Sequence, residues 1–204
     1  PTRRSSDLLY GQLAGILRQQ SLQPHFQPII HLGSGDLLGH EGLIRGPVDT
    51  PLHSPLPLFA AAERHGVRRK LEQACRETVF RAFAKLQLPG KLFVNSSLDC
   101  LDDELIFNGG TVDLLHQIGI SPGRVVIELT EQSPTEDFAL LDNALHHYRA
   151  MGFSIALDDL GAGYSSLRLW SELRPDYVKI DRHFIDGIHL DAVKREFVGS
   201  ILKI

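Results

Sequence analysis

Two adjacent carboxylates, Asp158 and Asp159, stand at the end of a short apolar stretch and are followed by a loop with two glycines. Residues 154–158 alternate apolar with small or polar side chains, which predicts a β-strand. Like charges this close oppose each other's ionisation, and proteins usually accommodate them with a divalent cation. An isolated Asp-Asp pair is nevertheless more typical of a solvated turn. The pair indicates a metal site only if other strands end in the same way.

Four further predicted strands carry a polar side chain near the carboxyl end, on the face opposite to their apolar residues. In residues 125–130, three apolar side chains share one face, while Glu128 lies on the other. The polar positions found in this way are Glu41, Asn95, Glu128, Asp158 and Lys179. Asp159 adds a fourth carboxylate to this group.

The chemistry of the group is that of hard metal ions, because it offers carboxylate and amide oxygens without thiol or imidazole. Such ligands favour Mg²⁺ or Mn²⁺ over zinc. Two such ions about 3.5–4 Å apart could hold a phosphate, activate a water and stabilise the leaving oxygen. Lys179 could hold the water or the phosphate by electrostatic stabilisation. One strand-end Asn or Asp is most often a cap or a turn residue, so the prediction of a metal site depends on the whole set.

The elements that must position these residues alternate between strand and helix. The predicted strands are residues 25–30, 37–44, 92–97, 125–130, 154–158 and 177–181. The predicted helices are residues 8–20, 58–64, 68–86, 114–118, 136–151, 165–173 and 191–204, the last running to the end of the chain. A parallel crossover needs about a dozen residues. The first two strands are too close for that, and we expect them to form an antiparallel hairpin.

The alternation of strands and helices predicts an α/β fold with a parallel sheet covered by helices. A TIM-like barrel would direct the polar strand-end residues into its mouth, where such folds keep their chemistry. An open doubly wound sheet is the alternative, but it would not require so many strands to end in inward polar groups.

The composition fits one soluble domain with its own core, since 43% of the 204 residues are hydrophobic. The net charge of −4 gives no argument for binding a nucleic acid polymer or a membrane. Cys75 and Cys100 show no disulfide or metal spacing, and no apolar run reaches about 18 residues. We therefore expect a cytoplasmic location, although the full-length protein could be tethered to a membrane.

The domain layout has three parts. We expect residues 1–7 to be a disordered or cloning-derived tail and residues 8–22 to include an amphipathic helix. That helix could be a joint to an upstream domain or a lid on the bottom of the barrel. Residues 23–204 would form the domain that carries the chemistry.

The same residues also carry a family resemblance. The sequence Glu41-Gly-Leu, with Phe26-Gln-Pro-Ile before it and Arg45 after it, resembles the signature of EAL domains, the bacterial phosphodiesterases for cyclic di-GMP. Further family motifs follow in order: Phe93-Val-Asn95, Glu128-Leu-Thr-Glu131, Asp158-Asp-Leu-Gly-Ala-Gly-Tyr-Ser-Ser-Leu167 and Lys179-Ile-Asp181. The resemblance covers the chain from about residue 24 to its end.

The resemblance implies a TIM-like (β/α)8 barrel with an antiparallel first strand and metal-dependent hydrolysis of cyclic di-GMP to linear pGpG. It implies that one metal is bound by Glu41, Asn95, Glu128 and Asp158. Asp158 and Asp159 would serve a second metal, both ions being Mg²⁺ or Mn²⁺. Ca²⁺ is expected to inhibit because its longer bonds and irregular geometry would misplace the water.

The remaining roles follow from the same resemblance. Lys179 would position the attacking water and act with Asp159 in catalysis. The dinucleotide would contact Gln27, Leu43 and Arg45. Glu131 would stabilise the loop after Asp159, and Asp181 is a weaker candidate for the site. A homodimer and an upstream regulatory domain, such as a GGDEF domain or a sensor, are expected as partners.

Departures from the family pattern are of two kinds. Gly42 stands where the family usually has Ala, and Leu160 and Ala162 replace Phe and Thr, changes that we interpret as tuning. The family pattern also continues beyond Ile204 with two more strand-helix units, which carry a further glutamate and a glutamine, so we expect this domain to be incomplete at its C-terminus. An inactive cyclic di-GMP receptor is the alternative function, but degenerate receptors usually lose metal ligands that this chain retains.

Overall fold

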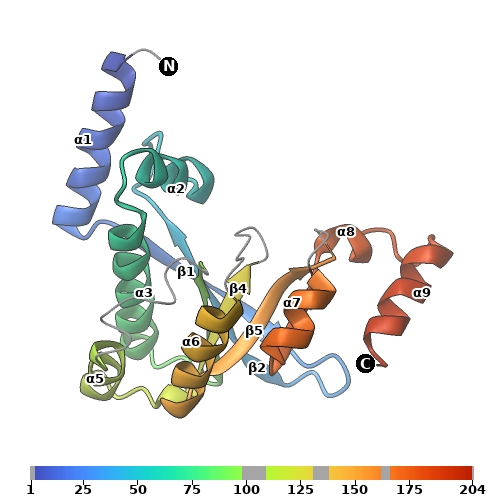
Figure 1. Cartoon of the computed structure of the whole chain (residues 1–204). Coiled ribbons are helices and arrows are strands. Elements are labelled where there is room, and N and C mark those ends of the chain that lie inside the picture. The colour runs from blue at the N-terminus through green and yellow to red at the C-terminus, as the bar shows by residue number, and fades with distance from the viewer. Residues whose placement is uncertain (1–2, 98–108, 131–137, 162–165, 204) are drawn as a thin grey trace. The chain divides into compact units, whose positions relative to one another are not determined.

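The computed structural model describes residues 3–97, 109–130, 138–161 and 166–203 (Figure 1). The chain forms two compact units, Pro1–Asn95 with Asp103–Val125 and Ser96–Asp102 with Val126–Ile204. Each unit has its own buried apolar residues, such as Phe83 in the first and Leu157 in the second.

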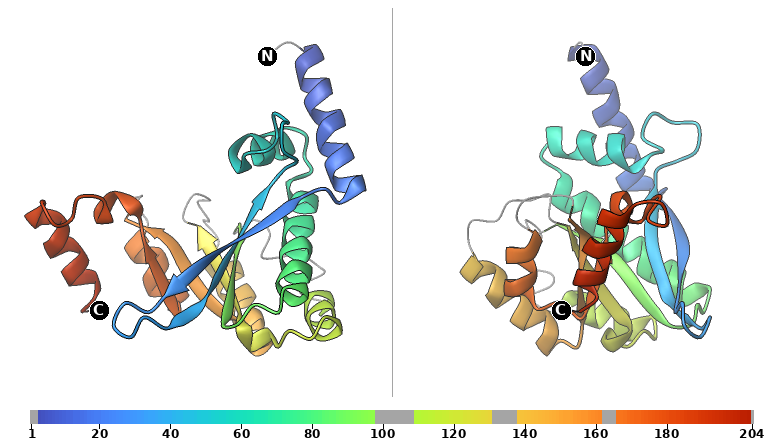
Figure 2. Two further views of the ribbon diagram at one scale, coloured as in Figure 1. Left: turned by 180° about the vertical axis from the view of Figure 1, so that it is seen from behind. Right: turned by 90° about the vertical axis from the view of Figure 1, so that its right-hand side faces the viewer.

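The first unit contains the predicted antiparallel hairpin, which is confirmed. Strand β1 (Gln23–Ile30) pairs antiparallel with β2 (Leu37–Arg45), and the two form a long twisted ribbon (Figure 2). Strand β2 then pairs parallel with β3 (Lys91–Ser96). The change of direction between the two pairings agrees with the short connection in the sequence.

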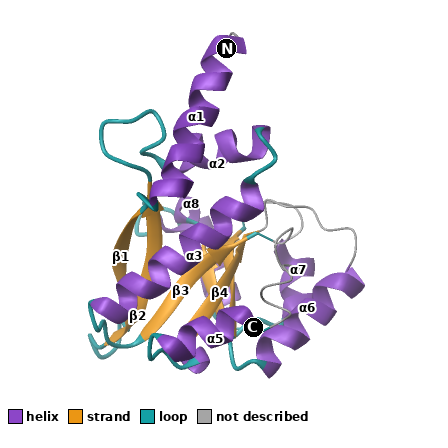
Figure 3. Cartoon of the chain, turned by 90° about the vertical axis from the view of Figure 1, so that its left-hand side faces the viewer, coloured by secondary structure: helices purple, strands orange, loops and turns teal. Residues whose placement is uncertain are grey.

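Four helices belong to the described part of the first unit. They are α1 (Arg3–Gln19), α2 (Pro55–Arg64), α3 (Arg68–Lys85) and α5 (Gly110–Gln117). Helix α3 packs against β1 and β2 (Figure 3). On β2 the alternate residues His40, Gly42 and Ile44 are buried, and His40 meets the ring of Phe83 edge-on at 6.2 Å. This face of β2 therefore belongs to the core under α3.

Arg124 fixes the turn between α3 and β3. It ends a short 3-10 helix (Pro122–Arg124) and donates from Nε to the Gly90 carbonyl at 2.9 Å and from Nη2 to the Leu88 carbonyl at 2.7 Å. Its guanidinium also lies 5.1 Å from the centre of the Phe83 ring. One planar cation thus satisfies two carbonyls and packs on the core at once.

Cys75 is a core residue of α3. Burial raises the pKa of its thiol to about 12, so the thiol stays protonated at neutral pH. Cys100 lies outside the described residues.

The second unit is built on three parallel strands. Strand β4 (Val125–Thr130) starts at its border and pairs with β5 (Ser154–Leu160), which pairs with β6 (Tyr177–Ile180). Helices α6 (Phe138–Ala150) and α7 (Ser166–Leu173) lie beside each other on β5 (Figure 1). The chain continues with α8 (Arg182–Ile185) and α9 (Ala192–Ile201).

Several boundaries differ from the sequence prediction. Helix α1 starts at Arg3, within the segment expected to be a tail, and residues 3–7 contain neither proline nor glycine to oppose a helix. Helix α9 ends at Ile201 rather than at the last residue. Helix α8 was not predicted, since four residues are too few to show a helical period. Among the described residues, every helix is too short or too polar to cross a lipid bilayer.

Asp176 secures the start of β5. Its Oδ2 accepts a hydrogen bond from the Ile155 amide at 2.8 Å, while its own amide donates to the Ile155 carbonyl at 2.8 Å. Asp176→Ala leaves the Ile155 N–H without this acceptor, and we expect the free energy of unfolding to fall by about 1–3 kcal/mol. Urea denaturation followed by circular dichroism measures the loss. As a control, Asp186→Ala removes an exposed carboxylate paired with Arg182 and should cost less than about 1 kcal/mol; equal losses would contradict the assignment.

Candidate active site

The first unit brings Glu41 and Asn95 together. Glu41 is half-buried on β2, and Asn95 is exposed near the end of β3. The Asn95 side-chain amide donates to Glu41 Oε1 at 3.3 Å. Both side chains lie on the face of the strands opposite to α3, because Glu41 alternates with the buried residues under that helix. This part of the first unit offers one carboxylate and one amide, both suited to a hard cation.

The same face of the hairpin carries the residues expected to contact a nucleotide. The strand register places Gln27 opposite Glu41 and His25 opposite Leu43, and opposing residues in an antiparallel pair share a face. Arg45 lies two residues further along, and its Nη1 donates to the Ile44 carbonyl at 2.8 Å. His25 was not among the predicted site residues, although its spacing of two from Gln27 indicates that the two share a face.

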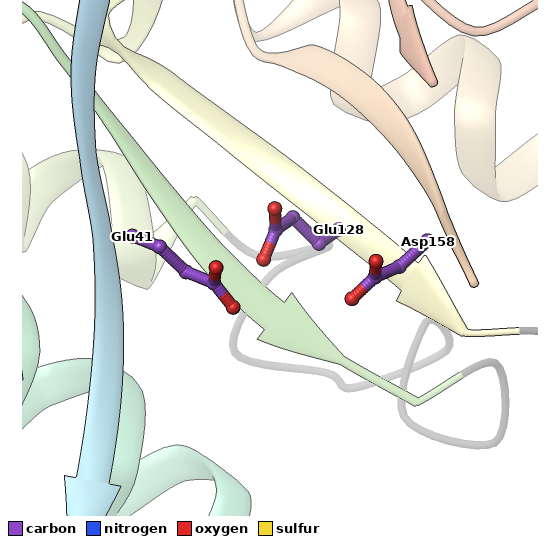
Figure 4. Close-up of side chains that lie close together, drawn as sticks. All are labelled: Glu41, Glu128 and Asp158. Atoms are coloured by element: carbon purple, nitrogen blue, oxygen red, sulfur yellow. The ribbon is translucent and has the colours of Figure 1, made fainter. Parts of the chain in front are cut away.

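The second unit holds a buried carboxylate. The Glu128 side chain on β4 is 0% exposed, and Lys179 Nζ lies 2.9 Å from its Oε1. The same ammonium lies 3.1 Å from Asp158 Oδ2 on β5. Glu128 and Asp158 point to the same side of their strands (Figure 4), as the parallel register requires. Removing a carboxylate from water costs several kcal/mol unless a cation compensates it, so this arrangement is a centre built around a positive charge.

Asp159 follows Asp158 in a left-handed backbone conformation with φ of 58°. This geometry lets the Asp159 amide donate to Asp158 Oδ1 at 2.9 Å, while an irregularity in the β5–β6 pairing returns Leu160 to the ladder beside Ile180. Strand β5 therefore continues through both aspartates, two residues beyond the predicted end. Positive φ at a residue other than glycine is uncommon and is often found at functional sites.

Gly161, the residue after β5, lies against Phe184 of α8. Its φ is 102°, and a Cβ at this position would overlap the Phe184 ring. The Phe184 ring in turn stacks on Phe197 of α9 with centroids 4.1 Å apart. Sequence analysis found the glycine but not Phe184, because only the fold shows that the two meet.

Asp181, the weaker candidate for the site, has local hydrogen-bond partners. The Asp181 side chain caps α8 by accepting from the His183 amide at 2.7 Å, and its backbone amide donates to the Leu160 carbonyl. This gives Asp181 a structural role. Glu131 and Ala162 lie outside the described residues.

A groove on the outer side of the first unit contains none of the predicted site residues. It has a volume of about 210 Å³ and lies between α3 and α5, where Arg76, Arg81 and Glu77 line it. Glu41 faces away from α3, so this groove is not part of the candidate site.

The family is decided by comparison with known proteins. Residues 11–204 match the family model described as EAL domain. The chain belongs to the EAL domain family. The resemblance in the strand-end motifs is thereby confirmed.

Relatives of this EAL chain carry names that concern cyclic di-GMP. The probable cyclic di-GMP phosphodiesterase PdeB of Escherichia coli is 29% identical over 186 residues, covering 89% of this chain and 36% of PdeB. The bifunctional diguanylate cyclase/cyclic di-GMP phosphodiesterase MucR of Pseudomonas aeruginosa is 29% identical over 208 residues, covering 95% of this chain and 29% of MucR. The chain thus spans only about a third of the length of these curated relatives.

Solved structures confirm the fold class. The calcium/cyclic di-GMP complex of Klebsiella pneumoniae BlrP1 at pH 8.0 is 29% identical with a TM-score of 0.80, covering 91% of this chain and 46% of that chain. A manganese/cyclic di-GMP complex of the same protein also has a TM-score of 0.80, with 30% identity and 90% of this chain covered against 46% of that chain. The EAL chain therefore has the TIM-like fold of this family.

The contact between Lys179 and Glu128 predicts a large effect on stability. Lys179→Met keeps the length of the side chain but leaves Glu128 and Asp158 without the ammonium. We expect the free energy of unfolding in EDTA to fall by about 3 kcal/mol, because breaking a buried pair strands a charge. Chemical denaturation measures it.

The matched control is Arg182→Met, which removes the cation of an exposed ion pair of 2.9 Å on α8. That loss should stay below about 1 kcal/mol. If Lys179→Met is no more costly than Arg182→Met, Lys179 does not compensate Glu128.

Proposed function

We propose that this EAL chain hydrolyses one phosphodiester bond of cyclic di-GMP and releases linear pGpG, using two divalent metal ions, Mg²⁺ or Mn²⁺. The observation that carries the proposal is the fully buried Glu128, whose carboxylate and that of Asp158 both contact the Lys179 ammonium. A protein core tolerates such a carboxylate only where positive charge is supplied. The names of the relatives support the choice of substrate, and the manganese/cyclic di-GMP complex of BlrP1 supports the choice of substrate and metal.

The proposed ligands of the first metal are Glu41, Asn95, Glu128 and Asp158, three carboxylates and an amide, and the family's strand-end motifs support this set. Asp158 and Asp159 would serve the second metal, and the hydrogen bond from the Asp159 amide to Asp158 supports a joint role. Bound there, such ions would supply the activation of a water and the stabilisation of a leaving oxygen.

Lys179 has two roles in this proposal. Its ammonium compensates Glu128 and Asp158 while the carboxylates hold no other cation. Once another cation neutralises these carboxylates, the ammonium can turn to the attacking water or to a phosphate oxygen. The flexible stem of lysine permits such a movement, which a planar guanidinium would resist.

Substrate recognition is assigned to the face of the hairpin that bears Glu41. We propose that Gln27, Leu43 and Arg45 contact the dinucleotide, since the register places all three on that face. The role of Arg45 follows from the fork of its guanidinium, which can hold a phosphate through two hydrogen bonds. Glu131 is proposed to hold the loop after Asp159.

The wider assembly belongs to the proposal as well. We propose a cytoplasmic homodimer controlled by an upstream GGDEF or sensor domain, and the length and name of MucR support the presence of further domains. The alternative function, a receptor that binds cyclic di-GMP without cleaving it, differs in one observable, the release of pGpG.

The metal ligands are tested by Glu41→Gln, which removes one negative charge at nearly constant size. We expect pGpG release, measured by chromatography, to fall at least about a hundredfold, because stabilisation of the developing charge is lost. Mn²⁺ binding by calorimetry should weaken, while the urea midpoint stays close to that of the parent. Ca²⁺ in place of Mg²⁺ should inhibit.

Glu63→Gln is the control, because the Glu63 carboxylate is 64% exposed on α2 and is not one of the predicted site residues. Its activity and metal affinity should equal those of the parent. Full activity after exhaustive dialysis against EDTA would refute metal dependence. Binding of cyclic di-GMP by the metal-loaded parent without pGpG release would favour the receptor.

Recognition is tested by Arg45→Ala, with Ca²⁺ present so that the substrate persists. The dissociation constant for cyclic di-GMP, measured by calorimetry, should rise about tenfold or more, the usual worth of a charge-assisted hydrogen bond. Arg45→Lys should restore only part of the affinity, because lysine lacks the fork. Arg64→Ala, at an exposed position of α2, should bind as the parent does. Unchanged affinity in Arg45→Ala would make Arg45 a purely structural residue.

A further inference from the structure

Strand β2 has two faces with different tasks. One face bears Glu41, Leu43 and Arg45, all half-buried, whereas His40 and Gly42 on the other are buried under α3. The backbone that carries Glu41 is therefore flanked on both sides by residues that pack against one helix. Any change in that packing is transmitted directly to the Glu41 main chain.

The closest part of this packing is at Gly42. A Cβ built on Gly42 would overlap Val79 Cγ1 and lie 3.4 Å from Val79 Cγ2 and 3.5 Å from the Phe93 carbonyl oxygen. Val79 is 2% exposed, and its branched side chain is stiff. Its methyl groups thus occupy the space that a side chain at position 42 would need.

The glycine serves space here rather than an unusual backbone angle, since Gly42 is not among the residues with positive φ. Glycine in a strand nevertheless leaves the backbone freer than any other residue. At position 42 this backbone freedom would make the positions of the Glu41 and Leu43 side chains less well defined. Val79 packs against the Gly42 backbone and restricts its movement.

We propose that Val79 is a positioning residue for Glu41: from α3 it fills the space over Gly42 and holds the β2 backbone that carries the carboxylate. The inference rests on the proposed function for the role of Glu41 as a metal ligand. The contact between Val79 and Gly42 stands independently of it.

The test is a double-mutant cycle in the full chain with two readouts. Amide hydrogen exchange over residues 41–43 reports on the backbone, and calorimetric titration with Mn²⁺ reports on the carboxylate. Val79→Ala opens the space, so exchange should be faster, and the dissociation constant for Mn²⁺ should rise about tenfold, as for other residues that orient metal ligands. Gly42→Ala should also weaken Mn²⁺ binding, because its new methyl group overlaps Val79.

The double variant Gly42→Ala/Val79→Ala adds one methyl group at position 42 and removes the two γ-methyl groups of Val79. It should recover both readouts to within about threefold of the parent, since facing large-to-small and small-to-large changes can compensate. Leu71→Ala, also on α3 and 0% exposed, is the control for general loss of stability. It should leave Mn²⁺ affinity unchanged and should not quicken exchange selectively at residues 41–43.

The outcomes separate this inference from the proposed function. If the parent fails to bind Mn²⁺, the proposed metal site is wrong, and selective exchange in Val79→Ala alone decides whether Val79 holds β2. If the parent binds Mn²⁺ and Val79→Ala behaves as Leu71→Ala in either readout, the positioning role is overturned. A double variant weaker than both single variants would overturn it too.

Discussion

The burial of Glu128 is the constraint on which the second unit depends. A carboxylate without exposed surface is tolerated only beside a cation, and Lys179 supplies one from a different strand while also reaching Asp158. A slip of one residue in the register of these strands would turn one partner to the opposite face. The electrostatic contact and the strand register therefore specify each other. The same contact keeps the carboxylates of Glu128 and Asp158 close together, as the binding of a divalent cation would require.

The first unit holds its acidic group by different means. Glu41 is half-buried, and its surroundings are set by packing on the reverse side of β2, where His40 meets Phe83 and Gly42 meets Val79. Arg124 further restrains this region, because it hydrogen-bonds the turn after α3 and packs on the Phe83 ring. One unit thus places its carboxylates by charge and the other by shape. Salt should therefore affect the carboxylates of the second unit more, and core mutations the carboxylate of the first.

Much of this organisation could be predicted from the sequence. The hairpin followed from a connection too short for a crossover, and the face of Glu128 followed from the two-residue period of a strand in β4. The sequence could not show that Lys179 contacts Glu128, because that depends on the proximity of distant strands. It also could not show the left-handed backbone of Asp159. The predicted strand therefore ended at residue 158, whereas β5 ends at Leu160. Helix α8 was not predicted, because its four residues are too few to show a helical repeat.

The contact between Gly42 and Val79 has a consequence for how such a chain can evolve. A single-base change from glycine to alanine at position 42, toward the family's usual residue, would meet Val79. A smaller residue at position 79 alone would leave the space over Gly42 unfilled. Either single step therefore gives a poorly packed intermediate, and the two changes are coupled. Motif swapping between relatives faces the same barrier. A transplanted signature would need its supporting helix residue to come with it.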